Sequence, residues 1–358
     1  EIVHSWNIQK DIVNPELKKV HDIDLEPEDT VQAVVDAHLF PNGDVIVTND
    51  LREFDNYRGI SMMRLDKDSK VIWQIIDEFH HDFNIDENGI IYALDFDLST
   101  DFPLIDFTDS NANIAYMNDM INIIDSSDGK ILDKISITEA FADSEYSYFL
   151  TSFVLEKNHT FQQFKFKDGT DVFDILHTNS VQYISSDLAN NSIFEAGDLL
   201  ISMRGLDAVA VIRPSLKKVV WAKTGPWRNQ HYARLNQDGN IYIYDNDGSG
   251  TVVSKGDKIT ISRAPRILSY NSKNDKINIV YYNPTYPESY SYWRGYFKKL
   301  KDDSFIISSS AQSRILQVDN DGSVIWELRA VTDRDVDNIP YLRRLVSVRH
   351  YYSDYVKF

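Results

Sequence analysis

Short apolar segments that follow polar turns recur along the chain. Each begins at a turn rich in Gly, Asn or Asp and continues as a run of aliphatic and aromatic residues of strand length. Asn-Gly and Asp-Gly pairs tolerate positive φ and are therefore typical of tight β-hairpins. Segments of this first type cover 41–47, 86–92, 196–201, 237–243 and, with a weaker turn, 301–307.

A second type of segment alternates with the first and ends in Trp or a similar residue. Its copies cover 66–73, 125–132, 215–221 and 319–326. One segment of each type predicts two hairpins, which together form a four-stranded sheet. A series of such sheets without helical linkers is typical of a β-propeller. A doubly wound α/β fold is disfavoured, because no helical periodicity alternates with the strands.

One long interval interrupts this spacing. Gly89 and Gly197 are 108 residues apart, whereas successive turns such as Gly43 and Gly89 are 46 residues apart. The long interval holds one blade together with an insertion at about 138–176. Within the insertion, residues 138–153 are the only stretch that predicts a short helix.

The two ends of the chain carry strand-like segments that lack partners in their own neighbourhood. These are residues 2–6, which resemble an outer strand ending in Trp, and residues 344–348. Because closure removes exposed sheet edges, we expect the two ends to complete the last blade. The sequence therefore predicts an all-β, six-bladed β-propeller that forms a single domain over residues 1–358.

The amino-acid composition excludes several classes of binding partner and of chemistry for this protein. The chain has 37 Lys and Arg against 55 Asp and Glu, a formal net charge of −18, which argues against a nucleic-acid partner or docking on an anionic membrane. It has no Cys, which excludes disulfides, thiolate metal sites and Cys nucleophiles. No apolar run is long enough for membrane insertion. The sequence begins at Glu1, so we expect an upstream signal peptide to have been removed.

Histidine recurs at matching positions of the repeats. Four repeats place it just before the inner strand: His38, the pair His80 and His81, His177, and His231. Equivalent positions in successive blades of a propeller point towards the same central axis. A single His at such a position most often caps a turn, but a register-matched set favours a common site.

Two further polar residues accompany this set. Asn179 lies two residues after His177, and residues i and i+2 of a strand share a face. Arg204 follows the apolar strand 199–201. An arginine next to converging imidazoles would make a site for an anion.

The chain resembles the arylsulfate sulfotransferases that work without a nucleotide sulfate donor. The match is ordered and covers the repeats from about residue 31 to residue 330. The segments that carry it are 80–82, 176–181, 197–204, 219–231 and 238–248. The resemblance implies a propeller with an axial site at which a histidine accepts the sulfuryl group of an aryl sulfate and passes it to a phenol.

The resemblance also implies roles for individual residues. His231 matches the nucleophile, which is transiently converted to sulfohistidine. The sulfuryl oxygens would be held by His177, Asn179 and Arg204. His81, or its neighbour His80, would act on the leaving or entering phenol oxygen. Neutral imidazole is nucleophilic near pH 7, and a covalent intermediate divides one difficult step into two.

The aryl ring of a substrate needs aromatic or polar contacts near the nucleophile. The expected substrate-binding residues are His80, Trp227, Arg228 and Tyr232, with Trp293 as a further aromatic residue at the rim. For the aromatic residues among them, packing between blades is about equally consistent with the sequence.

The resemblance implies no cofactor and no metal, and its small-molecule partners would be an aryl sulfate donor and a phenolic acceptor. It also suggests a periplasmic or secreted protein, and leaves a homodimer open. Two alternatives remain at this point. The chain could be a non-enzymatic propeller that binds a ligand or a protein, because fold does not determine function. It could also be a metal-dependent lyase or hydrolase in which three histidines bind zinc.

Overall fold

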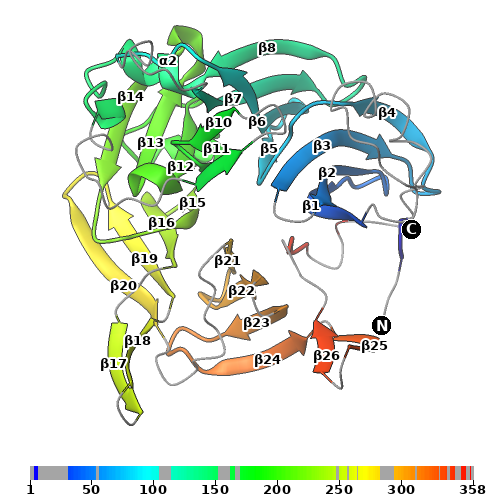
Figure 1. The fold of residues 1–358 in the computed structure, drawn as a ribbon, viewed down its shortest axis with the longest axis vertical. Helices are drawn as coiled ribbons and strands as arrows, with labels where there is room; N and C mark the ends of the chain where they lie inside the picture. The colour runs from blue at the N-terminus through cyan, green and yellow to red at the C-terminus, as the bar shows by residue number, and fades with distance from the viewer. Residues whose placement is uncertain are drawn as a thin grey trace.

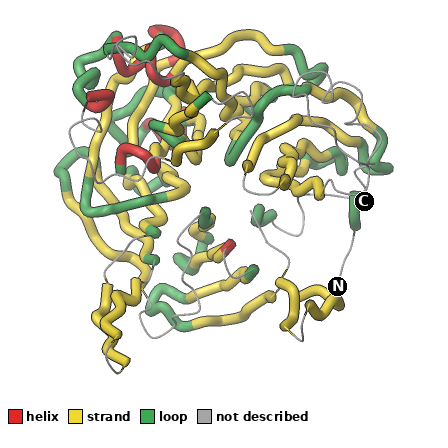
Figure 2. Tube along the Cα trace, in the orientation of Figure 1, coloured by secondary structure: helices red, strands yellow, loops and turns green. Residues whose placement is uncertain are grey.

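The computed structural model shows a ring of β-sheets around a central axis (Figures 1 and 2). The structure describes residues 4–6, 31–53, 56–104, 114–151, 162–165, 170–246, 250–255, 258–263, 265–282, 294–310, 313–329, 331–336, 339–342, 348–351 and 355. Within these residues, five units each contain four antiparallel strands; four of the units use consecutive strands, and in the fourth the β17–β18 hairpin intervenes. The β-propeller predicted from the repeats is therefore confirmed.

The five blades follow one another along the chain. Blade one contains β1 (Val31–Leu39), β2 (Val45–Glu53), β3 (Asn56–Leu65) and β4 (Val71–Ile75). Blade two contains β5 (Phe83–Ile85), β6 (Ile90–Ser99), β7 (Ile114–Asp125) and β8 (Ile131–Ser136). Blade three contains β11 (Thr178–Tyr183), β12 (Leu199–Met203), β13 (Ala208–Arg213) and β14 (Lys218–Thr224). Blade four contains β15 (His231–Leu235), β16 (Asn240–Asp245), β19 (Arg266–Asn271) and β20 (Lys276–Tyr282). Blade five contains β21 (Tyr296–Lys299), β22 (Phe305–Ser309), β23 (Arg314–Val318) and β24 (Val324–Arg329).

The Gly-containing turns form the hairpins that the sequence predicts. Gly239 shows why glycine is needed at one of them. Its φ is 77°, and a β-carbon there would lie 2.1 Å from the carbonyl oxygen of Asn191. A larger residue would therefore be strained by its backbone and would also clash with blade three.

Apolar side chains fill the space between neighbouring blades. Blades one and two share a cluster that includes Ile46, Met62 and Phe83, and the same arrangement recurs between each later pair. The second strand of a blade is commonly buried along its length, as in β12, whereas the outer strand β24 is largely exposed. Each blade therefore depends on its neighbours to cover its two faces.

The number of blades differs from the prediction of six. After β24, the described residues form β25 (Val331–Val336) and β26 (Ile339–Leu342), which pair with each other as a two-stranded sheet. One hairpin supplies only half of a four-stranded blade, so five blades, not six, are present in the described part. Residues 2–3 and 344–347 of the expected closing strands lie outside the described residues, and closure by these strands stays a prediction.

Two short terminal pieces nevertheless contact the first and last blades. Trp6 packs on the apolar face of blade one formed by Val45, Val47, Met63 and Leu65. Val348 packs against the cluster that blades four and five share. The two ends of the chain therefore lie in the sector between blade five and blade one (Figure 1).

The region of the predicted insertion lies beside blade two. Helix α2 (Ile137–Ala142) begins after Ser136, whose side chain accepts a hydrogen bond from the Glu139 backbone N–H. It ends well before residue 153, so it is shorter than predicted. Strands β9 (Gln162–Lys165) and β10 (Asp171–Asp174) form a hairpin, and β10 pairs in parallel with the first residues of β7.

The remaining elements are short. They are α4 (Ser186–Ala189), the 3₁₀ turns η2 (Arg204–Leu206) and η3 (Pro214–Leu216), and the hairpin of β17 (Gly250–Lys255) and β18 (Lys258–Arg263). The β17–β18 hairpin projects from blade four away from the ring (Figure 1). None of the helices in the described ranges has the length and apolar character required to cross a membrane.

Trp227, an expected substrate-binding residue, belongs to the core between blades three and four. It is fully buried and packs with Ile184, Leu200 and Leu268. Its indole Nε1–H donates to the Asp207 carbonyl oxygen at 2.9 Å. The structure therefore gives Trp227 a packing role and does not bring it to a pocket.

Replacing Trp227 by Phe tests this role. The variant loses a hydrogen bond and part of a fully buried ring, so we expect the free energy of unfolding to fall by about 1–3 kcal/mol. Denaturant unfolding measures the change, with the exposed neighbour Arg228→Ala as the control, for which we expect a change within about 0.5 kcal/mol. Equal stability of Trp227→Phe and the wild type would contradict the packing role.

Candidate active site

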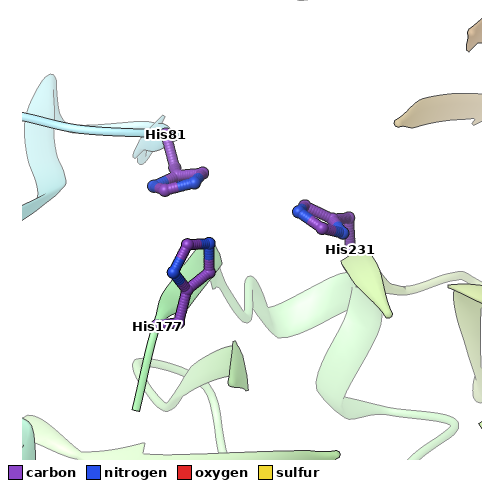
Figure 3. Close-up of side chains that lie close together, drawn as sticks. All are labelled: His81, His177 and His231. Carbon is purple, nitrogen blue, oxygen red and sulfur yellow. The ribbon is translucent and has the colours of Figure 1, made fainter. Parts of the chain in front are cut away.

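Three histidines from three blades face one another near the axis (Figure 3). His81 directly precedes Asp82 and β5, His177 directly precedes β11, and His231 is the first residue of β15. One ring nitrogen from each lies within 4.8 Å of the other two. The ring centroids are 4.9 Å apart for His81 and His177, 6.3 Å for His177 and His231, and 6.4 Å for His81 and His231.

The position of these residues follows from the blade repeat. His81 and His177 both have positive φ, 55° and 48°, at the point where the chain turns into an inner strand. Arg294, with φ 57°, occupies the corresponding place before β21 in blade five. Positive φ is uncommon for residues other than Gly, and such positions gather at functional sites.

His38, the remaining histidine of the register-matched set, is not part of this cluster. It lies near the end of β1, opposite Ile46, rather than before the strand. Its ring packs against Phe40 and Tyr351 instead. A position at the other end of an inner strand cannot reach the point where the other three converge.

The hydrogen bonds of His231 define a neutral imidazole. Its Nδ1 lies 3.0 Å from the Asn229 carbonyl oxygen and 2.9 Å from Asn246 Oδ1, so Nδ1 carries the proton that these acceptors require. Its Nε2 accepts the backbone N–H of Arg294 at 3.1 Å. Burial, followed by the charges of His177 and Arg204, holds the pKa of His231 well below 6.5.

His177 is paired with a buried carboxylate. Its Nδ1 lies 2.5 Å from Asp174 Oδ2. Burial opposes ionisation of Asp174, but the charge of His177 and this hydrogen bond, together with His80 and Arg204, hold the pKa of Asp174 below its usual value. An ionised Asp174 accepts the Nδ1–H of His177, which fixes the orientation of the ring and directs its Nε2 away from the carboxylate.

A second carboxylate lies behind this pair. Asp119 accepts the backbone N–H of Thr178 at 2.6 Å. Burial and the nearby charge of Asp174 raise the pKa of Asp119 to about 7. Near neutral pH, Asp119 is therefore partly protonated, which limits the negative charge behind His177.

His80 and His81 are joined to each other. Their Nδ1 atoms are 2.8 Å apart, so one donates and the other accepts. Burial lowers the pKa of His80 to about 4 and that of His81 well below 6.5. Of the two, His81 is the one that lines the pocket beside the cluster, whereas His80 lies behind it.

The pocket at this site encloses about 380 Å³, including space open to solvent. Its walls include His81, Asn179, His231 and Arg294 on one side. Tyr232 and Tyr296 also line it, with ring centroids 4.1 Å apart. The pocket therefore brings imidazole, guanidinium and phenol groups together beside the cluster.

Asn179 and Arg204 lie close to the histidines. Asn179 Nδ2 donates to the Gln230 carbonyl oxygen at 2.8 Å, and its Oδ1 is buried without a hydrogen-bond partner among the described residues. The Arg204 backbone N–H donates to the His177 carbonyl oxygen at 3.1 Å, and the charge of Arg204 lowers the pKa of both Asp174 and His231. Strands β11 and β12 pair through Thr178 and Met203, which brings the neighbouring Asn179 and Arg204 close to one another.

The charge balance favours an anion over a metal ion. Three imidazoles at this spacing are donors that zinc accepts. However, Arg204 and Arg294 place positive charge beside the cluster, and Nε2 of His231 already accepts an N–H. A divalent cation would be repelled by these guanidinium groups, whereas a sulfuryl group would be attracted.

A protein-family comparison decides the family. A family model described as Arylsulfotransferase (ASST) matches residues 36–331, more than four-fifths of the chain. The chain belongs to the arylsulfotransferase family. The resemblance carried by the sequence motifs is thus confirmed. No curated protein matches the sequence.

Solved structures similar to this family member are distant. A protein of unknown function from Bacteroides caccae has 10% identity and a TM-score of 0.45, covering 83% of this chain and 81% of its own. A catalytically inactive virginiamycin B lyase from Staphylococcus aureus, solved with quinupristin, has 11% identity and a TM-score of 0.41, with coverages of 86% and 72%. The β-propeller domain of Cps50 (Swd1) from Myceliophteria thermophila has 8% identity and a TM-score of 0.40, with coverages of 84% and 94%.

The remaining expected residues of this arylsulfotransferase family member are placed differently. Tyr232 lines the pocket, as expected of a substrate-binding residue. The Arg228 side chain is exposed, and only its backbone N–H, which donates to Asp245, is tied to blade four. Arg228 is not among the residues that line the pocket. Trp293 lies outside the described residues.

Several residues of the site were not anticipated from the sequence, among them Asp174, Asn246 and Arg294. Asp174 precedes His177 by three residues, a spacing that could have indicated the pair. Asn246 follows β16, and Arg294 precedes β21 at the position that histidine occupies in blades two and three. Only alignment of the strand starts would have indicated Arg294.

The depressed histidine pKa values give a prediction for stability. His38 and His80 have pKa values of about 4, and those of His81 and His231 lie well below 6.5. Below about pH 6.5 these four histidines bind protons in the unfolded chain but not in the folded protein, so acid favours unfolding. The raised pKa values of the buried carboxylates Asp82, Asp95 and Asp119 act in the opposite direction, but the histidines outnumber them. We expect a melting temperature that is nearly constant above about pH 7.5 and falls steadily from about pH 6.5 towards pH 4. A melting temperature that does not change between about pH 7 and pH 5, followed by circular dichroism, would contradict this account.

Proposed function

We propose that this chain transfers the sulfuryl group of an aryl sulfate to a phenol through a covalent intermediate on His231. Family membership supports sulfuryl transfer in general. The observation that carries the proposal is the state of His231, which is neutral and protonated on Nδ1, so that Nε2 is the nucleophilic atom.

The first half-reaction forms an N–S bond and breaks an S–O bond. Nε2 of His231 attacks sulfur, and the aryl oxygen leaves with the electron pair as a phenolate, which takes its proton from water. His231 then carries a positive charge, and its Nδ1–H remains hydrogen-bonded to the oxygens of Asn229 and Asn246. These two acceptors stabilise the charge that develops on the ring.

The second half-reaction reverses these bonds with a different oxygen. The acceptor phenol attacks sulfur, the N–S bond breaks, and the electron pair returns to Nε2 of His231. The phenol proton passes to neutral His81 and from there to solvent. A neutral imidazole is a suitable base for this step, and the depressed pKa of His81 provides it near pH 7.

Cationic groups stabilise the transferred group. Sulfuryl transfer, like phosphoryl transfer, places charge on three equatorial oxygens. In this proposal, His177, Arg204, Arg294 and the Asn179 amide have the role of holding these oxygens. Each such donor is typically worth about 10²–10³ in rate. Tyr232 and Tyr296 provide an aromatic surface for the aryl group.

Substitution of His231 tests the nucleophile. We expect His231→Ala to release nitrophenol from 4-nitrophenyl sulfate at least about 10³-fold more slowly than the wild type, with or without added phenol. His4→Ala, at the edge of blade one and far from the cluster, is the matched control and should retain full activity. Stopping the wild-type reaction with base and measuring the intact mass should show one added SO3 group, absent from the variant. Full nitrophenol release by His231→Ala would refute the role, and a wild type without turnover would favour a non-enzymatic propeller.

Substitution of Asp174 tests its support of His177. Asp174→Asn keeps the shape of the side chain but removes the negative charge from the acceptor of the His177 Nδ1–H. Loss of a charge-assisted hydrogen bond of this kind corresponds to a fall of about 10- to 100-fold in kcat/KM. Asp198→Asn, which removes a buried carboxylate paired with Arg213 on blade three, is the control. Equal kcat/KM values for the two variants would show that the Asp174 carboxylate does not assist the reaction.

A further inference from the structure

One wall of the pocket contains a buried network of two carboxylates and two guanidinium groups. Asp36 of β1 and Asp82, which directly follows His81, both line the pocket and are almost fully buried. Arg234 donates from Nη2 to Asp82 Oδ2 at 2.6 Å, and its guanidinium lies 3.6 Å from the centroid of the Tyr232 ring. Burial, together with the nearby charge of Asp36, raises the pKa of Asp82 above its usual value.

Arg349, near the end of the chain, bridges the two carboxylates. It donates from Nε to Asp36 Oδ1 at 3.1 Å and from Nη2 to Asp36 Oδ2. The same Nη2 lies 3.2 Å from Asp82 Oδ1 and 3.1 Å from the Phe83 carbonyl oxygen. With Arg349 in place, two negative and two positive groups balance one another.

The residues beside Arg349 attach the same segment to other blades. Val348 packs on the cluster shared by blades four and five. The Tyr351 hydroxyl accepts the backbone N–H of Leu39 at 2.9 Å. Residues 348–351 therefore reach from blade five to blades one and two, across the sector in which the described residues form no four-stranded blade.

We infer that Arg349 is a positioning residue that closes the ring at the pocket and keeps the wall beside His81 electrically neutral. Without it, two buried carboxylates would share Arg234 alone, and the wall would carry a net negative charge facing an anionic substrate. Because Asp82 is joined to His81 by one peptide bond, any movement of Asp82 would also displace His81.

The other charged and titratable groups around Arg349 do not replace it. Tyr232 and Tyr296 surround it, and burial raises the pKa of both phenols, so they stay neutral. His38 is neutral because burial lowers its pKa to about 4. Lys298 on β21 carries positive charge near Arg234 and Arg349, but its side chain is exposed and is not bonded to either carboxylate in the described structure.

A charge-balanced pair of variants tests this inference, which rests on the proposed function for its kinetic measurement. We expect Arg349→Ala to lower kcat/KM for 4-nitrophenyl sulfate by about 10- to 100-fold, mainly through a higher KM, because the pocket wall becomes negative. Asp36→Asn together with Arg349→Ala restores the balance and should recover at least about tenfold of that loss. Arg213→Ala, which removes an arginine from the buried carboxylate Asp198 on blade three, is the matched control and should keep the wild-type KM.

Two kinetic results would overturn the inference. One is an Arg349→Ala variant with the same KM as Arg213→Ala. The other is a double variant no better than Arg349→Ala, since a merely structural role would make the two substitutions additive. If Arg349→Ala does not fold, Arg349→Lys, which keeps the charge, should fold with a KM above that of the wild type, because one ammonium group cannot reproduce the planar fork that joins both carboxylates. A wild-type KM for Arg349→Lys would overturn the inference.

Thermal unfolding separates failure of this inference from failure of the proposed function. If the wild type has no sulfotransferase activity, the proposed function fails. Arg349→Ala should still melt at a lower temperature than Arg213→Ala, and Asp36→Asn should restore part of the difference. Absence of that restoration would overturn the role of Arg349 whether or not the protein is an enzyme.

Discussion

Burial of apolar faces between neighbouring blades is the constraint on which the rest of this structure depends. A single four-stranded sheet cannot cover its own two faces, so each blade is held by the clusters that it shares with the next. That packing sets the angle between blades and brings the starts of the inner strands to one axis. His81, His177 and His231 meet because three successive blades pack in this way, although 150 residues separate the first from the last.

The site carries local positive charge although the chain as a whole is strongly negative. The protein has a net charge of −18, yet the groups around the cluster are arginines and imidazoles, and the nearest carboxylates are bonded to them. Asp174 is bonded to His177, and Asp82 is bonded to Arg234 and Arg349. An anion approaching the molecule therefore meets repulsion at a distance and attraction only inside the pocket, which favours ligands small enough to enter it.

The sequence predicts the propeller and the meeting of the histidines, because both follow from a repeat that is visible in the residues. The turns at Gly89 and Gly239 set the register, and the residues just before the inner strands follow from it. The number of blades does not follow, because the segment after β24 forms a single hairpin in the described residues rather than four strands. The position predicted for His38 was also wrong. His38 lies near the end of its inner strand rather than before the start, so it is at the opposite end from the other histidines.

Side-chain partners were harder to predict than strand positions. Asp174 is the last residue of β10, so its contact with His177 follows from the placement of the β9–β10 hairpin beside β7. Arg294 reaches the site because blade five packs next to blade four. Trp227 differs from these residues, because it was expected to bind substrate and instead lies in the core. For an aromatic residue close to the site in sequence, both positions were equally consistent with the sequence. The indole N–H of Trp227 donates to the carbonyl oxygen of Asp207, within the packed interface between blades three and four.

The hydrogen bond from the Arg294 backbone to Nε2 of His231 has a consequence for the proposed reaction. In that proposal Nε2 attacks sulfur, so the Arg294 N–H would have to leave this nitrogen as the N–S bond forms. The freed N–H would lie beside the oxygens of the transferred group and could donate to one of them. One backbone group would thus serve the nucleophile first and the sulfuryl group afterwards.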